Sequence, residues 1–173
     1  MGWLDRKTKG NDPNPYLGLR RQALTLDPKQ LGLAPSPEHP QVFAGFMEMG
    51  MEGGVATLVV IADGSTSLYY STGGGIIGAG FHEQVKGPSQ AFLAALERHA
   101  TEMTPDDPAH PLPTNGITQL RARTFSGDCL FAAAPGADFG EKRHPLWEPF
   151  YAAHEVISAM RQLPAVNNRQ PGR

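Results

Sequence analysis

The segment STGGGIIGAG, residues 71–80, contains the residue pattern most suggestive of ligand chemistry in this chain. Five of its ten residues are glycines, and Gly73-x-Gly75-x-x-Gly78 matches the spacing that brings backbone amides to a dinucleotide phosphate. That fold requires a parallel strand before the loop and an acidic residue at the end of the next strand, about 20 positions later. Here a hairpin precedes the glycines, and the matching position, Glu97, falls within a helical pattern. The sequence therefore predicts no nucleotide cofactor.

The side chains that most often catalyse reactions or bind metals form no recognised constellation. The histidines lack the HExxH and zinc-finger spacings, and His99 and His154 fall on the inner faces of helices, as core histidines do. Cys129 begins a strand pattern and is expected to be a small buried hydrophobe. Asp106 and Asp107 fall in a proline-rich loop, a poor scaffold for acid–base catalysis. We predict no catalytic, cofactor-binding or metal-binding residue.

Arg121 and Arg123 alternate along one strand pattern and are expected on the wet face of an antiparallel sheet. An alternative is a small-ligand or enzymatic site formed by the glycine run 73–80, His82 and these two arginines. A single pocket in which all three features converge would favour this alternative.

A geometric role explains the glycine run better than a phosphate site does. Glycine permits positive φ and close backbone approach, and in strands it marks bends. Ile76 and Ile77 inside the run indicate that the segment packs onto a core. We expect a sheet edge that curls and then leads into a helix.

The elements around these residues indicate an α+β protein with about five mostly antiparallel strands, in the order β-β-β-α-β-β-α. Two amphipathic helices are expected to pack on the sheet, because apolar residues recur at three- and four-residue intervals in both. Asp63-Gly64 indicates the turn between the second and third strands. The expected strands are 42–49, 54–63, a third that includes Tyr69, 117–125 and 129–134, and the expected helices are 83–103 and 146–163.

We expect a single domain over residues 26–163, between a flexible N-terminal arm at 1–25 and a disordered tail at 164–173. Basic side chains gather in the two terminal segments, and the body between them is acidic. Because phosphate binding needs cations clustered on the folded surface, general nucleic-acid binding is not expected.

Residues 54–103 resemble the strand–turn–strand–helix middle of roadblock-type and longin-type small domains. The resemblance rests on GVATLVVIADGSTSLYYSTGGG and the long Ala- and Leu-rich helix after it. It implies a non-catalytic scaffold that dimerises and binds GTPases or complex subunits. The chain departs from the roadblock pattern in having a strand at 42–49, where that domain has a helix, and two strands after the central helix.

The cysteine count and the lack of long apolar segments favour a cytoplasmic protein. Its 173 residues carry a net charge of −2 and one cysteine, which excludes an intrachain disulfide and suits a reducing compartment. No apolar run reaches the roughly 18 residues of a membrane span, and the first residues lack the apolar stretch of a secretory signal.

These observations favour a non-catalytic interaction or scaffold domain, more a binding module than an enzyme. No lysine or proline lies within residues 64–80 to protect the third strand as an edge, so we expect the domain to cover that edge by forming a homodimer or by binding another protein. The expected interaction surface comprises Tyr69, Tyr70, Gly73, Gly74, Gly75 and His82.

Overall fold

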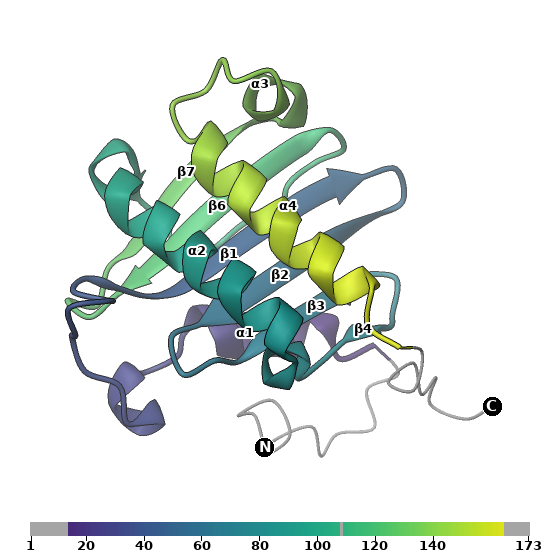
Figure 1. Cartoon of the computed structure of the whole chain (residues 1–173). Coiled ribbons are helices and arrows are strands. Elements are labelled where there is room, and N and C mark those ends of the chain that lie inside the picture. Colours follow the sequence, from purple (N-terminus) through teal and green to yellow (C-terminus); the bar gives the residue numbers. More distant parts are fainter. Residues whose placement is uncertain (1–13, 108, 165–173) are drawn as a thin grey trace.

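The two strongest strand patterns of the sequence lie side by side in the middle of a seven-stranded antiparallel sheet (Figure 1). The computed structural model describes residues 14–107 and 109–164. The sheet has the order β4-β3-β2-β1-β6-β7-β5. Its strands are β1 (Val42–Met51), β2 (Gly54–Ile61), β3 (Thr66–Tyr70), β4 (Gly75–Ile76), β5 (Thr104–Pro105), β6 (Ile117–Thr124) and β7 (Cys129–Pro135).

Helices cover both faces of this sheet. The long helices α2 and α4 run side by side across one face, and α1 lies behind the other (Figure 1). The helices are α1 (Tyr16–Leu24), α2 (Glu83–His99), α3 (Gly136–Gly140) and α4 (Trp147–Arg161), with 3₁₀ turns η2 (Pro28–Leu31), η3 (Ala79–Phe81) and η4 (Ala100–Glu102).

The α+β class is confirmed, but the expected five strands and two helices were too few. The additional strands β4 and β5 are two residues long, and a pair that short has no alternating pattern to recognise. The additional helices are α3, with five residues, and α1.

The β2 strand shows how the sequence produces a core on both sides of the sheet. Successive side chains of a strand point to opposite faces. Leu58 and Val60 therefore pack against α2 and α4, whereas Val59 and Ile61 pack on the α1 side. The β-branched run of this strand, expected to be buried on both faces, is buried from Val55 onward.

The N-terminal segment is folded where the sequence predicted a flexible arm. Within the expected arm 1–25, residues 16–24 form α1, which buries Tyr16, Leu19 and Leu24 against the sheet. The prediction failed because the apolar positions of this helix are interrupted by Arg20, which is itself buried. Residues 1–13 and 165–173, which include most of the expected tail, lie outside the described residues.

The glycine run forms its own edge strand. Gly73 and Gly74 have φ of 103° and 80°, which turns the chain back so that Gly75 pairs with Tyr69. A Cβ on Gly75 would lie 2.3 Å from the Leu68 carbonyl oxygen, and one on Gly80 would lie 1.7 Å from the Gly64 carbonyl oxygen. The expected curled edge leading into a helix is confirmed. The expected unprotected third strand is wrong, because β4 covers it.

The ends of α2 and α4 are joined by His99. Its Nδ1 lies 2.8 Å from Glu102 Oε2, and its Nε2 lies 2.9 Å from Glu148 Oε2 at the start of α4. Burial opposes protonation of the imidazole, but the hydrogen bonds and charges of the two carboxylates outweigh it and raise the pKa of His99. His99 is hydrogen-bonded as expected, but it is half-buried at the end of α2 and does not belong to the core.

Candidate functional site

A chain of buried charges crosses the sheet face beneath α1. Glu48 on β1 is 1% exposed and accepts hydrogen bonds from Arg20 at 2.6 and 2.8 Å. It also accepts one from Nη1 of Arg121, which is 0% exposed. Glu48 is opposite Gln119 in the sheet register, so Arg121, two residues further along β6, projects from the same face. One carboxylate on the central strand thus binds two guanidinium groups from different elements.

The chain of charges continues from Arg121 into the proline-rich loop after β5. Arg121 Nε donates to Asp106 Oδ2 at 2.7 Å, and its Nη2 donates to the Pro111 carbonyl at 3.2 Å. The guanidinium also lies 4.9 Å from the centre of the Phe131 ring, within the range of a cation–π contact.

The sequence predicted Arg121 on the solvent-exposed face of the sheet, and this prediction is wrong, because Arg121 is fully buried. The prediction failed because the loop and α1 cover this part of the sheet, and because two carboxylates offset the cost of burying the guanidinium. The loop approaches β1 closely at Gly50, where a Cβ would lie 1.9 Å from the Thr114 carbonyl oxygen.

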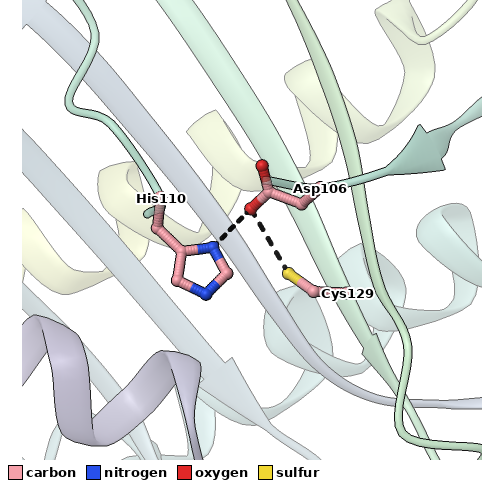
Figure 2. A group of neighbouring side chains, drawn as sticks. All are labelled: Asp106, His110 and Cys129. Carbon is pink, nitrogen blue, oxygen red and sulfur yellow. Dashed lines mark hydrogen bonds and ion pairs between the residues drawn. The ribbon is translucent and has the colours of Figure 1, made fainter. Parts of the chain in front are cut away.

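The loop brings Asp106 and His110 beside Cys129 (Figure 2). The Asp106 Oδ2 atom lies 2.6 Å from His110 Nδ1 and accepts a hydrogen bond from the Cys129 thiol at 3.6 Å. His110 has φ of 45°, in the left-handed region that few non-glycine residues adopt. The carboxylate stands between the imidazole and the thiol, so the three groups do not form a nucleophile–base pair.

Burial and charge set the protonation of this cluster. Burial opposes ionisation of Asp106, but its hydrogen bonds to His110 and Arg121 outweigh burial and lower the pKa of the carboxyl. Burial, together with the Asp106 charge, raises the pKa of the Cys129 thiol to about 12. Cys129 is therefore a neutral thiol near pH 7 and not an activated nucleophile.

The cluster opens into a shallow cleft of about 400 Å³ between the end of α1 and the loop, which we call the Cys129 cleft. Arg123 lines this cleft, but its guanidinium donates to the Leu24 carbonyl and lies 5.5 Å from the Phe43 ring centre. The full lining is Leu24, Thr25, Pro105, Asp106, His110, Arg123, Gly127, Asp128 and Cys129.

A second pocket, of about 460 Å³, lies at the start of α2 and is called here the Phe81 pocket. It differs from the Cys129 cleft in being lined by α2 rather than α1. Its lining combines apolar and polar residues in similar proportion: His39, Val60, Ile61, Ala62, Asp63, Gly64, Ser65, Gly80, Phe81, Lys86, Ser89, Gln90 and Leu93.

The residues expected to form an interaction surface have different environments. Tyr69 is 3% exposed, and its ring packs edge-on against Tyr16 at 5.8 Å. Tyr70 is half-buried against the α2 and α4 core. Gly73 and Gly74 are exposed at the β3–β4 turn, while Gly75 and His82 are half-buried. The exposed part of this surface is therefore the turn and not the tyrosines.

The structure does not bring together the residues of the alternative site. The glycine run forms β4 at one edge of the sheet, and three strands separate it from β6, which carries Arg121 and Arg123. Neither of the two pockets above is lined by His82, and only the Cys129 cleft includes one of these arginines.

Sequence reasoning missed Glu48 and the pairing of Asp106 with His110. Glu48 is the single charge in the apolar strand 42–51, and a lone acidic residue in a strand buried on both faces signals a buried partner. The Asp106-x-x-x-His110 spacing gave no comparable signal, because the loop geometry that joins the two side chains has no sequence period.

These features define an α+β domain with a buried charge chain, the Cys129 cleft beside α1 and the Phe81 pocket beside α2. Comparison with known proteins finds no matching family model, no matching curated protein and no matching solved structure. The resemblance of residues 54–103 to roadblock-type and longin-type domains therefore stays a prediction. Among the described residues, no helix combines the length and apolar character needed to cross a membrane.

Proposed function

We propose that this chain is a non-catalytic interaction domain that self-associates through the Phe81 pocket. Two features of the Cys129 cleft weigh against catalysis as the primary role. Its thiol is protonated near neutral pH, and Arg121 is bound by Glu48 and Asp106 instead of facing a substrate.

The observation that carries the proposal is the exposure of Phe81 at the rim of the pocket that it lines. The Phe81 side chain is 71% exposed, and Ile77, four residues earlier, is 49% exposed. Covering a phenylalanine side chain contributes about 1.5–3 kcal/mol, so a partner that buries this ring gains a substantial part of its binding energy there. Val60, Ile61 and Leu93 supply apolar walls in the adjoining pocket.

The arrangement is self-complementary. In a two-fold dimer the same patch meets itself, so a protruding ring beside a pocket can be exchanged reciprocally between two copies. The pocket volume of about 460 Å³ accommodates an aromatic ring. Asp63 and Lys86 also line the pocket, which places opposite charges on the surface that would meet its symmetry mate. We therefore assign a second copy of this chain as the partner.

Light scattering at tens of micromolar protein tests the proposal. The wild-type chain is expected at twice 18.6 kDa. Phe81→Asp is expected at 18.6 kDa, because it replaces the apolar ring that the partner would bury by a charged carboxylate. Leu17→Asp is the matched control, since Leu17 is 59% exposed on α1, away from the pocket, and this variant should remain dimeric.

A wild-type chain that stays monomeric at every concentration would overturn self-association. A dimer that survives Phe81→Asp would place the interface elsewhere and overturn the role of Phe81. The small-ligand alternative predicts the first of these outcomes, because a ligand pocket requires no second copy.

A further inference from the structure

We propose that Asp106, His110 and Cys129 form a binding site for a divalent transition-metal ion of the zinc class. This site is independent of the self-association proposed above, because it lies in the Cys129 cleft and not in the Phe81 pocket.

The spatial argument rests on three donor atoms from three chain positions. One imidazole nitrogen, one thiol sulfur and one carboxylate oxygen all lie within 4.8 Å of one another. Ligands of a tetrahedral zinc ion lie about 2.0–2.3 Å from the metal, which places them roughly 3.3–3.8 Å apart. Asp106 Oδ2 and Cys129 Sγ are 3.6 Å apart in the structure. His110 Nδ1 lies 2.6 Å from the same oxygen and bonds it, so the imidazole must turn away from the carboxylate to present a nitrogen lone pair to the ion.

The donor chemistry selects the kind of ion. A nitrogen, oxygen and sulfur set suits borderline ions such as Zn²⁺ and Co²⁺, whereas Mg²⁺ and Ca²⁺ favour oxygen ligands alone. Three protein ligands leave a fourth position for water, and the cleft gives solvent access to it. All three residues are half-buried, so the ligands are ordered by their surroundings while remaining reachable.

Arg121 orients the carboxylate without occupying both of its oxygens. Within the described part of the chain, the hydrogen bonds that Asp106 accepts from His110, Arg121 and Cys129 all involve Oδ2. Groups that hold a metal-binding carboxylate in place in this way are a regular part of metal sites. Glu48 on the other side of Arg121, a carboxylate shared with Arg20, offsets part of the guanidinium charge and so reduces repulsion of an incoming cation.

Binding requires one proton to leave. The Cys129 thiol gives its proton to solvent as the metal–sulfur bond forms, and its hydrogen bond to Asp106 is lost. The His110 Nδ1 proton, which bonds Asp106 in the ion-free site, stays on the ring, and the neutral imidazole binds the ion through the lone pair of its other nitrogen. The two charges of the ion are offset by the thiolate and the Asp106 carboxylate.

Cobalt titration of the full, tag-free chain tests the site, because a Co²⁺–thiolate bond gives a near-ultraviolet charge-transfer absorption. The chain has one cysteine, so this absorption reports Cys129 alone. We expect the band to saturate at one Co²⁺ per chain and to disappear when Zn²⁺ is added, since zinc binds such sites more tightly than cobalt does.

Isothermal titration calorimetry with Zn²⁺ separates the site from adventitious binding. Cys129→Ser and His110→Asn should each raise the zinc dissociation constant at least about tenfold, because a hydroxyl or an amide replaces a preferred zinc ligand. Asparagine is chosen because it tolerates the left-handed backbone at His110. His99→Asn is the matched control, since His99 contacts two carboxylates outside the cluster, and it should leave zinc binding unchanged.

The absence of a cobalt–thiolate band in the wild-type chain would overturn the proposal, and this measurement requires no variant to fold. Zinc affinity that is unchanged in both Cys129→Ser and His110→Asn would also overturn it. Affinity lost in His99→Asn but not in the cluster variants would move the metal site to the α2–α4 junction and equally contradict the proposal.

Discussion

Glu48 and Arg121 form an ion pair from which solvent is excluded, between neighbouring strands at the centre of the sheet. Replacing Glu48 by Gln should lower the free energy of unfolding by about 3–5 kcal/mol, because Arg20 and Arg121 would keep their charges without a carboxylate between them. Urea unfolding followed by circular dichroism measures the change. Glu52→Gln, in the exposed β1–β2 turn, is the control. Equal midpoints for the two variants would contradict a stabilising role for the pair.

The packing of α1 predicts that this helix contributes to global stability. Leu24 is 3% exposed, and Leu24→Ala should cost about 2–5 kcal/mol, because it leaves a cavity between α1 and the sheet. Leu17→Ala, on the exposed side of the same helix, should change stability by less than about 0.5 kcal/mol. Thermal unfolding of both variants checks the difference. If Leu24→Ala were as stable as wild type, α1 would be dispensable, as expected of a flexible arm.

The two tyrosines of the α1-side core should respond oppositely to loss of their hydroxyl groups. The Tyr69 hydroxyl is buried and has no hydrogen-bond partner among the described residues, so Tyr69→Phe should stabilise the protein by up to about 1 kcal/mol. The Tyr16 hydroxyl bonds Thr57 Oγ1 at 2.7 Å, so Tyr16→Phe should destabilise it by about 0.5–1.5 kcal/mol. Denaturant unfolding compares the two, and a loss of stability in Tyr69→Phe would reveal a partner for that hydroxyl.

Two glycines predict opposite effects of the same substitution. Gly80→Ala places a methyl group 1.7 Å from the Gly64 carbonyl oxygen, and the turn must shift to admit it, so we expect a loss of more than about 1 kcal/mol. Gly87 lies in α2 with open space around it, and Gly87→Ala should stabilise the helix by about 0.5–1 kcal/mol. If Gly80→Ala and Gly87→Ala shifted the melting temperature in the same direction, the close approach of the chain at Gly80 would be contradicted.

The His99 junction predicts a pH-dependent contribution to stability. Because the folded pKa of His99 is raised above its unfolded value, its contribution is fully present below the unfolded pKa and is lost as the pH rises through the folded one. The stability advantage of wild type over His99→Asn should therefore be larger near pH 5 than near pH 9. The gain should stay within about 1 kcal/mol, because both partner carboxylates are partly exposed. Urea unfolding at the two pH values measures it, and an advantage that grows toward alkaline pH would contradict the assignment.

The parts of the fold that were predictable from sequence are those with a local signal, either a repeating hydrophobic pattern or a characteristic turn dipeptide. The apolar run of β2, the turn at Asp63-Gly64 and the stripe of α2 have local signals, and all three elements are present. The edge strand β4 was anticipated only as a bend, because its pairing depends on glycine torsions that do not alter the hydropathy pattern.

The candidate site was less predictable, because its members come from distant parts of the sequence. Arg121 alternates with apolar neighbours as a solvent-facing residue does, and only the position of α1 and the loop makes it a buried one. Cys129 was expected to be a small buried hydrophobe, but it is half-buried and its thiol bonds Asp106, a contact that depends on where the loop crosses the sheet. Neither arrangement is a local property of the chain.

The central place of β1 in the sheet has a consequence for the order of events during synthesis. Glu48 on β1 is paired with Gln119 on β6, so the middle of the sheet cannot close until a long intervening stretch has left the ribosome. The α4 residues Val156 and Ile157 complete the same core still later. Such distant pairings slow folding, because the loop entropy must be overcome before the contacts form. We therefore expect the β1–β2 hairpin to emerge early and to gain lasting protection against amide exchange only after the C-terminal helix has docked.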